Sequence, residues 1–515
     1  MLIGIDLGTS SVRAAVVDEG GRIQGLGQQE YPIEMPRPGW AEQDPEQWWR
    51  ATCLACREAI VRAAAEPSDI AAISFSGQMH GTVLVDAAGR ALGKSIIWAD
   101  GRGGALAGRL NQALGEERLA ELAGNRVAPG FMAATLGWLG EQEPAELARA
   151  RWALLPKDYL RLRLGGDPAS EPSDASATLL FDVRRGAWSG ELTQAVGVDG
   201  ALLPPLARST DVVGRLSAAA GAELGLLAGV PLVAGAGDQA AQAVGNGVMV
   251  SSVASCTIGT GGQVLQPLDA PHADPQLRVH CFCHALPNTW FLMAATLSAG
   301  LSLRWWRDTL GLPAEGAYEA LDREAERAGI GAGGLLFLPY LLGERTPHMD
   351  SGARGAFVGL GLEHSRGHLA RAVMEGVALS LRQGLDIMAS LTLPPDGLVA
   401  SGGGAKSRLW RQIQADVLGK PLRTVRGAER AVVGAAMLAG LGVGVYADFD
   451  QAREACVHYG DTVTPDRDRV AAYNRLLKVY EHLYPALLPV YVRLAEIRAL
   501  TADNPSITAE ADSDS

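Results

Sequence analysis

Two aspartates lie where apolar segments of the chain end, and both could take part in proton or metal chemistry. Asp6 lies near the end of the apolar run 2–7, and Gly237 and Asp238 follow the apolar run 231–236. A carboxylate in such a place can bind Mg2+, which keeps much of its water shell, or accept a proton as a general base. Asp6 also suits a turn, and Asp238 also suits a helix N-cap. From position alone, the base and N-cap explanations for Asp238 carry equal weight.

Two glycine-centred turns with similar surroundings provide candidate phosphate sites. The turns at 6–11 and 258–262 each join two apolar runs, so each is predicted to form a β-hairpin. Glycine reaches positive φ without steric cost, and successive N–H groups can then surround an anion. One such turn alone is more simply explained as an ordinary hairpin. Its repetition favours two phosphate-binding hairpins, one in each of two lobes.

A polar loop follows the predicted strand 70–75 and offers groups that suit hydroxyl recognition. Gln78 supplies an amide, Met79 an apolar neighbour and His80 an imidazole. Ligands often bind where loops leave the ends of strands. A single histidine in a loop is nevertheless more often a bystander than a ligand contact.

Three consecutive glycines, 402–404, follow another short apolar run and precede a predicted helix that begins at about Ser407. Bare main chain of this kind allows a flat base to lie against it, although a flexible turn would need the same residues. Phosphoryl transfer requires a bound triphosphate, a placed metal ion and an oriented acceptor oxygen. The motifs along the chain can meet each of these requirements. They are, in order, the first hairpin, the loop suited to hydroxyls, the strand-end aspartate, the second hairpin and the triple glycine.

The elements expected to position these residues begin with an antiparallel trio of strands at 2–7, 12–17 and 23–28. Asp44 is predicted to cap a helix that starts at Pro45 and runs to about residue 65. A helix-rich insertion is expected over 100–225. A long helix after Glu363 has apolar residues at steps of three and four, as does a helix packed on a sheet.

Length and charge restrict the class of protein. A chain of 515 residues predicts two or three domains, and a net charge of −12 argues against a nucleic-acid partner. The first residues lack the features of a signal peptide, so a cytoplasmic protein is expected. The apolar stretch 431–447 is too short for a membrane span and predicts a buried helix. The acidic, polar residues 501–515 are predicted to be disordered.

Six cysteines leave two explanations open. Cys53 and Cys56, with the segment 280–284, have types found in zinc sites. However, the first pair lies in a helical pattern, and the segment 279–286 has the pattern of a strand. We therefore interpret them as reduced, buried thiols without a metal, which fits a cytoplasmic enzyme.

The chain resembles the FGGY family of carbohydrate kinases from residue 1 to about residue 487. The segments that carry the resemblance are 3–10, 42–49, 76–81, 155–163, 282–287, 343–348 and 355–375. The loop Gln78-Met79-His80-Gly81 discriminates most within the family, and it is similar to that of bacterial members that phosphorylate the ketose D-xylulose.

The resemblance implies an α/β fold of the actin-like kind, with a duplicated ribonuclease-H-like core and ATP in a cleft between two lobes. It implies an N-terminal lobe over 1–246, including the insertion, and a C-terminal lobe over 247–490. It also implies a homodimer, ATP and Mg2+ as cofactors, and a small sugar as partner, with no membrane partner.

Site residues follow from the same resemblance. Asp238 is implied as the catalytic base and Asp6 as the aspartate on the magnesium side. The implied sugar contacts are Gln78, Met79, His80, Asp238 and Gln239. The implied ATP contacts are Gly8, Thr9, Ser10, Gly259, Thr260, Gly261, Gly403, Gly404 and Ser407.

Two other functions remain to be weighed against a kinase for D-xylulose. One is a kinase of the same family for another ketose or polyol, such as ribulose. The other is an ATPase of the actin or Hsp70 kind that phosphorylates no metabolite. Such an ATPase would share the two hairpins but would need neither the loop at 78–80 nor a base at Asp238.

Overall fold

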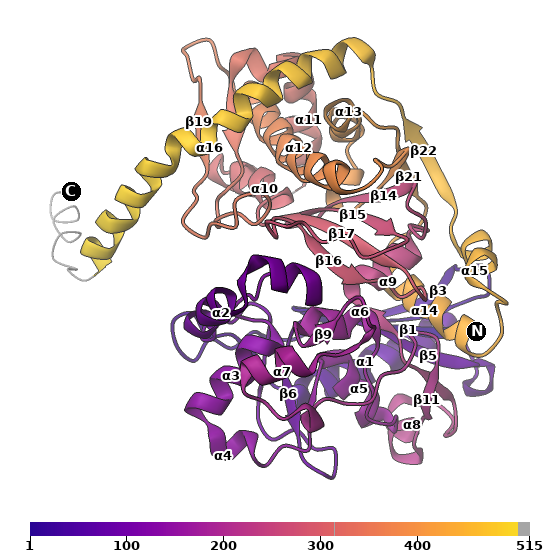
Figure 1. Ribbon diagram of the computed structural model, residues 1–515. Helices are drawn as coiled ribbons and strands as arrows, with labels where there is room; N and C mark the ends of the chain where they lie inside the picture. The colour runs from indigo at the N-terminus through magenta and orange to yellow at the C-terminus, as the bar shows by residue number, and fades with distance from the viewer. Residues whose placement is uncertain (314, 503–515) are drawn as a thin grey trace, which may run out of the picture. The chain divides into compact units, whose positions relative to one another are not determined.

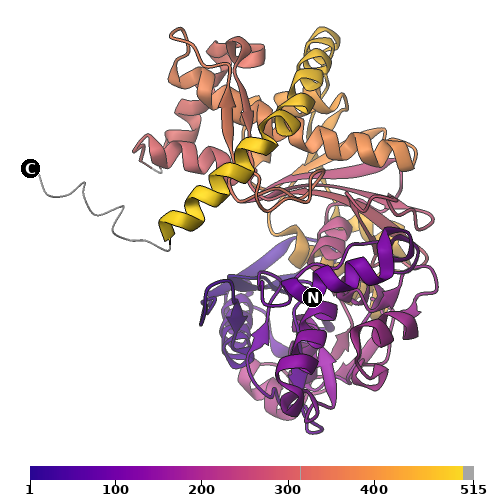
Figure 2. The same cartoon turned by 60° about the vertical axis from the view of Figure 1, so that its left-hand side comes forward.

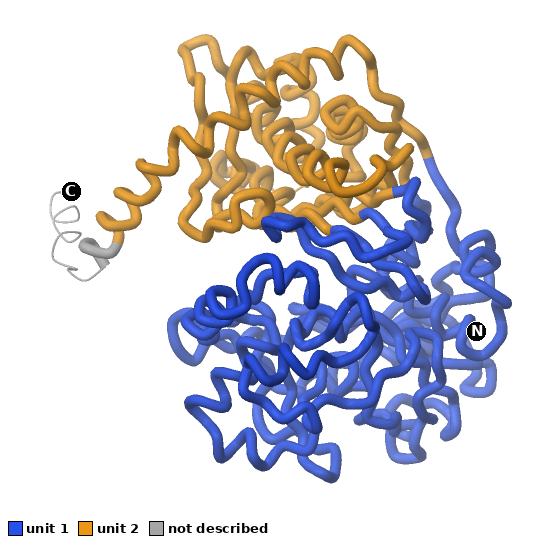
Figure 3. Tube along the Cα trace, viewed as in Figure 1, with its two compact units in different colours: residues 1–253, 266–292, 425–460 blue, residues 254–265, 293–424, 461–515 orange. Residues whose placement is uncertain are grey.

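The computed structural model describes residues 1–313 and 315–502, drawn from two sides in Figures 1 and 2. These residues form two compact units (Figure 3). Unit 1 comprises Met1–Val253, Gln266–Leu292 and Val425–Gly460, and unit 2 comprises Ala254–Leu265, Met293–Thr424 and the chain from Asp461. The tail predicted to be disordered is 501–515, and its residues 503–515 lie outside the described part of the chain.

A seven-stranded mixed sheet carries the first hairpin. Its strands, in spatial order, are β11 (Val212–Arg215), β12 (Pro231–Val233), β5 (Ala72–Gly77), β1 (Leu2–Leu7), β2 (Ser11–Val17) and β3 (Ile23–Glu30), with β13 (Ala236–Gly237) also paired to β5. β1, β2 and β3 are antiparallel, while β5 runs parallel to β1. The predicted trio of strands is confirmed.

The alternation of side chains along β1 decides which residues reach the site. Ile3, Ile5 and Leu7 belong to the apolar core that includes Trp48 of α1 (Pro45–Ala63). Gly4 faces the other way, where a Cβ atom would lie 2.1 Å from the carbonyl oxygen of Val432 in α14 (Arg430–Gly442). Because successive side chains alternate, Asp6 lies on the same face as Gly4.

Helix α1 begins as predicted. Asp44 is its N-cap and accepts a hydrogen bond from the backbone N–H of Glu46, and Pro45 is the first helical residue. The helix ends two residues earlier than predicted, because Ala64 adopts a left-handed conformation with φ of 49°. The helix packs on β2 and β3.

The segment 100–225 is rich in helices, as predicted. They are α2 (Gly104–Leu122), α3 (Met132–Gln142), α4 (Pro144–Leu147), α5 (Pro156–Leu164), α6 (Pro172–Ala175), α7 (Gly190–Val196) and α8 (Ala218–Leu224). A short 3-10 turn, η2 (Ser176–Thr178), continues directly from α6. Short strands β6 (Val83–Val85) and β8 (Trp152–Leu154) pair within the same part of the chain.

A second seven-stranded sheet carries the second hairpin. Its order is β16 (His280–Cys283), β17 (Trp290–Thr296), β15 (Gly262–Leu268), β14 (Val253–Ile258), β20 (Gly397–Ser401), β21 (Leu422–Val425) and β22 (Tyr459–Val463). The order β17-β15-β14-β20-β21 repeats the order β3-β2-β1-β5-β12 of the first sheet. The structure therefore contains the same strand arrangement twice, with one hairpin in each copy.

Five further helices lie in unit 2. They are α10 (Gly300–Thr309), α11 (Ala317–Ala328), α12 (Arg366–Leu391), α13 (Arg408–Leu418) and α16 (Arg467–Ala502). The long helix predicted after Glu363 is α12. In Figures 1 and 2, the C-terminal part of α16 extends away from the rest of unit 2.

Two helices distant in sequence meet in unit 1. α9 (Asp238–Gly245) packs on α14, and a Cβ on Gly434 would lie 1.9 Å from the carbonyl oxygen of Ala241. This contact requires glycine because the two backbones approach so closely. The predicted buried helix at 431–447 corresponds to α14. No described helix has the length and hydropathy needed to cross a membrane.

Candidate active site

Asp6 lies at the carboxyl end of β1 and is buried. Ser76 Oγ of the neighbouring β5 donates a 2.6 Å hydrogen bond to Asp6 Oδ1. Burial raises the pKa of Asp6, and the Ser76 hydrogen bond and Arg13 act in the opposite direction. Asp6 is therefore a carboxylate held in place by a neighbouring strand rather than an exposed turn residue.

Asp238 is the first residue of α9, and its position decides against the N-cap explanation. The N-cap residue is Gly237, and no side chain caps this helix end. Burial and the nearby charge of Asp6 raise the pKa of Asp238 to about 7, although hydrogen bonds with Gln239 lower it. A carboxyl that titrates near neutral pH suits proton transfer to and from a hydroxyl group.

The loop that follows β5 lies close to this helix start. Gln78 is buried, and its Nε2 donates a 2.8 Å hydrogen bond to Gln43 Oε1. Gln78 Oε1 is buried and accepts no hydrogen bond from any described residue. Met79 is also buried and packs against Gly237, because a Cβ on that glycine would lie 3.0 Å from Met79 Cγ. The loop and the start of α9 therefore form one site within unit 1.

His80 is held by a short set of specific contacts. Its ring stacks on Phe131 at a centroid distance of 3.7 Å, and its Nδ1 lies 2.7 Å from the carbonyl oxygen of Ala177. Because a carbonyl only accepts, Nδ1 carries the proton of this contact. The backbone of His80 has φ of 75°, which is uncommon for a residue with a side chain. The ring is thus positioned before any ligand binds.

The first hairpin turns its carbonyl groups toward the protein. Gly8 O accepts from the Tyr31 hydroxyl, Thr9 O accepts from Gln43 Nε2 at 2.6 Å, and Ser10 O accepts from the Tyr31 N–H. None of the described residues accepts a hydrogen bond from the backbone N–H of Thr9 or Ser10. Two successive donors therefore remain at the turn, which is the arrangement that binds an anion.

The second hairpin repeats this arrangement in unit 2. Gly259 O accepts from Gly300 N, and Thr260 O accepts from Ala299 N, both at 2.9 Å. Here too, no described residue accepts from the backbone N–H groups of Thr260 and Gly261. The parallel between the two hairpins extends from strand order to individual backbone groups.

The triple glycine lies beside the second hairpin. Gly402 has φ of 76°, and a Cβ there would lie 2.5 Å from the carbonyl oxygen of Ile258; a Cβ on Gly404 would lie 2.6 Å from Ile258 Cβ. Gly403 belongs to the same turn. Ser407 caps α13 by accepting a 3.0 Å hydrogen bond from Trp410 N. The structure thus places Gly259–Gly261 and the glycine turn next to each other in unit 2.

The donor set in unit 1 fits a magnesium ion. The charge of Asp6 raises the pKa of Asp238, so the two carboxyl groups lie close enough to interact. A cation beside them would be attracted by both carboxylates. Mg2+ is commonly bound through one or two carboxylates together with water and substrate phosphates.

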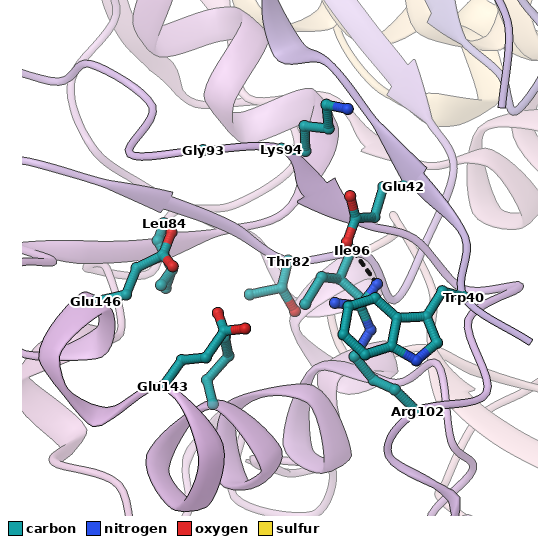
Figure 4. Close-up of a pocket in the computed structure, with 11 residues that line it drawn as sticks. Trp40, Glu42, Thr82, Leu84, Gly93, Lys94, Ile96, Arg102, Glu143 and Glu146 are labelled. Atoms are coloured by element: carbon teal, nitrogen blue, oxygen red, sulfur yellow. Dashed lines mark hydrogen bonds and ion pairs between the residues drawn. The ribbon is translucent and has the colours of Figure 1, made fainter. Parts of the chain in front are cut away.

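A separate cavity of about 260 Å3 lies near the loop, and Thr82 contributes to its lining (Figure 4). Glu42 and Arg102 form an ion pair of 2.7 Å on one side of it, and Glu143 and Glu146 lie on the other. None of the predicted site residues lines this cavity.

The cysteines are all free and buried. Cys53 and Cys56 lie in α1, while Cys281 and Cys283 lie in β16. Burial raises the pKa of Cys53 to about 12. The described residues contain no group of three or more histidine, cysteine, aspartate or glutamate side chains arranged to hold a metal ion.

Two groups of site residues were missed from the sequence. Ser76 and Gln43 orient Asp6 and Gln78, and their hydrogen bonds span 70 and 35 residues of sequence. A fully buried cluster of charged residues also lies behind the loop. Its members are Lys157, Asp158, Arg161, Glu171 and Asp174. The run of charges at 157–163 could have signalled this cluster, but charged residues in a helix usually face solvent.

Comparison with known protein families gives a match over most of the chain. Residues 1–245 match the N-terminal domain of the FGGY family of carbohydrate kinases, and residues 254–443 match its C-terminal domain.

Individual proteins are similar over nearly their full length. The chain is 37% identical to the xylulose kinase of Escherichia coli strain K12 over 491 residues, which is 95% of this chain and 100% of that protein. It is 36% identical to the xylulose kinase of Bacillus subtilis strain 168 over 94% of this chain and 96% of that protein. The crystal structure of xylulose kinase from Rhodospirillum rubrum superposes with a TM-score of 0.87 at 31% identity, covering 95% of this chain and 99% of that one.

Proposed function

Because the chain belongs to the FGGY family of carbohydrate kinases, with its actin-like α/β fold and use of ATP, we propose that its substrate is D-xylulose. The products are ADP and D-xylulose 5-phosphate. The observation that carries this assignment is the identity of 36 to 37% to xylulose kinases over at least 94% of the chain. The loop Gln78-Met79-His80, whose polar groups suit hydroxyls, supports it.

Asp238 is proposed as the general base. Its carboxylate accepts the proton of the terminal sugar hydroxyl while that oxygen forms a bond to the γ-phosphorus of ATP. The bond between the γ-phosphorus and the bridging oxygen breaks, and ADP leaves with the electron pair. The raised pKa of about 7 supports this role, because the carboxylate is then a stronger base than an ordinary aspartate.

The sugar is proposed to contact Gln78, Met79, His80 and Gln239 as well as Asp238. Gln78 Oε1, which is buried without a hydrogen-bond partner among the described residues, is an acceptor for a sugar hydroxyl, and the His80 ring lies in the same loop. Met79 supplies the apolar surface that packs on the carbon skeleton. Gln239 directly follows Asp238 in α9, and its amide supplies both a donor and an acceptor.

ATP is proposed to bind through the two hairpins and the triple glycine. The unpartnered N–H groups of Thr9, Ser10, Thr260 and Gly261 donate to phosphate oxygens, and Gly8 and Gly259 allow the close approach. Gly403 and Gly404 lie against the adenosine, with Ser407 at the start of the adjacent helix.

Mg2+ is proposed to be held by Asp6 through water, with Asp238 nearby. When bound, the ion neutralises charge that develops on the phosphate oxygens. Ser76 donates to this carboxylate, which lowers the pKa of Asp6 against the larger, raising effect of burial.

Three further proposals concern the chain as a whole. The functional lobes are residues 1–246 and 247–490, and each contributes one hairpin. The protein acts in the cytoplasm, for which the six reduced, buried cysteines are favourable. It forms a homodimer, and apolar side chains that α16 exposes offer a surface for the contact.

A substrate panel tests the assignment. ADP release is measured with ATP and Mg2+ in the presence of D-xylulose, L-xylulose, D-ribulose, glycerol or no sugar. The proposal predicts the highest kcat/KM with D-xylulose and little release without sugar. A preference for ribulose or glycerol would replace the substrate, and release that no sugar stimulates would favour an ATPase of the actin or Hsp70 kind.

A further inference from the structure

One short segment, residues 171–178, touches the elements that carry both the candidate base and the candidate sugar-binding histidine. Ser173 Oγ accepts a 3.0 Å hydrogen bond from the backbone N–H of Gly237, the residue directly before Asp238. Four residues later, the carbonyl oxygen of Ala177 accepts from His80 Nδ1 at 2.7 Å. The two contacts bridge 64 and 97 residues of sequence.

The segment is itself fixed by one buried carboxylate. Glu171 is the N-cap of α6, and its side chain accepts hydrogen bonds from the N–H groups of Ser173 and Asp174 at 2.9 and 3.0 Å. Ser173 Oγ donates to Glu171 Oε1 at 2.8 Å, so the same hydroxyl donates to Glu171 and accepts from Gly237. Ser209 Oγ donates to Glu171 Oε2 at 2.8 Å.

The charged cluster behind the segment holds neighbouring elements to it. Lys157 Nζ lies 2.7 Å from Asp158 Oδ1 and 3.4 Å from Glu171 Oε1, and none of these side chains is exposed. Arg161 Nη1 donates to the carbonyl oxygen of Ala234 at 3.0 Å, just before Asp238 along the chain. Lys157 also packs against Gly77 at the end of β5, because a Cβ there would lie 2.8 Å from Lys157 Cβ.

Stability alone is a weak reason for such a cluster. Removing charges from water is costly, and buried ion pairs can often be replaced by apolar side chains without loss of stability. Here Arg161 donates to Ala234 and Ser173 accepts from Gly237, both shortly before the helix start of the site, and Lys157 packs against Gly77 directly before the loop. A role in setting geometry explains this convergence.

We propose that Ser173, oriented by Glu171, is a positioning residue that sets the separation between the Asp238 carboxylate and the His80 imidazole. The inference rests on the proposed kinase function for its catalytic consequence, but the contact itself is independent of any substrate. Positioning of this kind affects the rate of the chemical step because reacting groups must be aligned closely before the reaction.

The test compares Ser173→Ala with a matched control, Ser209→Ala. Both changes remove one buried hydroxyl that donates to Glu171, but only Ser173 contacts Gly237. We expect Ser173→Ala to lower kcat with D-xylulose about 10- to 100-fold, with an unchanged KM for ATP and a Tm close to that of Ser209→Ala. The control keeps the wild-type kcat. An unchanged kcat in Ser173→Ala, or an equal loss in Ser209→Ala, would overturn the inference.

Amide hydrogen exchange supplies a readout that needs no sugar. In Ser173→Ala, peptides that contain Gly237 are expected to exchange faster than in the wild type and in Ser209→Ala, because the Gly237 N–H loses its acceptor. Equal exchange in the three proteins would refute the positioning role. If the wild type phosphorylates no sugar in the panel, the proposed function fails, and the exchange measurement still decides whether Ser173 fixes Gly237.

Discussion

At the scale of single residues, the structure separates the two carboxylates by environment. A hydrogen bond from Ser76 favours the charged form of Asp6, and hydrogen bonds with Gln239 favour the charged form of Asp238. Burial raises the pKa of both groups, and for Asp238 the charge of Asp6 adds to this effect. The added charge effect at Asp238 supports the proposal that Asp238 is the base and Asp6 the metal ligand.

The raised pKa of Asp238 predicts how activity depends on pH. A general base must be deprotonated, so kcat/KM for the sugar falls as the pH decreases through about 7. The fall is about tenfold per pH unit well below that value, because only the ionised fraction reacts. Steady-state rates from about pH 5.5 to about pH 8.5 measure it. A profile that stays flat across the neutral range would contradict the assignment of the pKa.

The hydrogen bond from Ser76 predicts a change in magnesium requirement. Ser76→Ala removes the donor that holds Asp6 Oδ1, so the carboxylate is no longer fixed in place for the cation. A hydrogen bond to a charged group contributes about 1.5–3 kcal/mol, so the Mg2+ concentration for half-maximal activity should rise about tenfold or more. Activity measured across a Mg2+ titration gives this value.

Ser74→Ala is the control for this change. Ser74 lies on the same strand and is equally buried, but its hydroxyl has no hydrogen-bond partner among the described residues. We expect this variant to keep the wild-type Mg2+ dependence. If the two variants behave alike, Ser76 does not act through Asp6.

At the scale of secondary-structure elements, the base depends on how α9 packs. α9 begins at Asp238 and lies so close to α14 that Gly245 and Gly434 each leave no room for a side chain. A Cβ on Gly245 would lie 1.9 Å from the carbonyl oxygen of Arg430. The position of the carboxylate is therefore coupled to a helix almost 200 residues away in sequence.

Gly434→Ala tests this packing. The added methyl group would lie 1.9 Å from the carbonyl oxygen of Ala241, so the helices must separate. Overpacking of this kind costs about 1–3 kcal/mol, and both Tm and kcat should fall. Thermal unfolding followed by circular dichroism measures the first effect.

Gly108→Ala provides the opposite case. Gly108 lies in α2 and is exposed, and a Cβ added there would have no other atom within 4 Å. Alanine is favoured over glycine in a helix by about 1 kcal/mol, so this variant should be slightly more stable than the wild type. A loss of stability equal to that of Gly434→Ala would show that the effect is not due to the close helix contact.

The elements that could be predicted are those whose signals are local. Alternating apolar residues identified β1 and β2, and Asp44 with Pro45 identified the start of α1. The return of residues 425–460 to unit 1 has no local signal, because it depends on the fit of Gly434 against a helix reached through the whole intervening chain.

The residues of the candidate site differ in the same way in how far the sequence signals them. Asp6, His80 and Asp238 could be selected individually because each has a reactive side chain next to a strand end or turn. Their partners could not, because Ser173 has no property in the sequence that distinguishes it from other serines. Its role arises only from the contact with Gly237, which the folded chain creates.

At the scale of the whole molecule, the repeated sheet gives two hairpins with the same backbone arrangement. Each hairpin presents two N–H groups without partners among the described residues, and the strands around the two hairpins have the same spatial order. A triphosphate carries several anionic oxygens that need such donors. This duplication supports the proposal that each hairpin donates to phosphate oxygens of ATP.

The proposed homodimer predicts a change of mass in solution. Leu488, Val490, Val492 and Leu494 on α16 are between 38 and 53% exposed. Val490 and Leu494 are four residues apart and share one face of the helix, and exposed apolar side chains on a shared face are typical of interaction surfaces. We expect light scattering after size exclusion to give twice the mass of one chain, and Val490→Asp with Leu494→Asp to reduce it to a single chain.

Val61→Asp is the matched control, since Val61 on α1 is 79% exposed and lies on a different unit. This variant should keep the dimer. A wild-type mass of one chain would contradict the dimer, and dissociation caused by Val61→Asp would show that α16 is not its specific surface.

The turnover of Asp238→Asn with D-xylulose tests the central claim most directly. Asparagine has nearly the same shape as aspartate but cannot accept the proton, so kcat for sugar-dependent ADP release should fall about 10²–10⁴-fold, while the KM for ATP stays at its wild-type value. A variant that phosphorylates D-xylulose at the wild-type rate would contradict the assignment of Asp238 as the base.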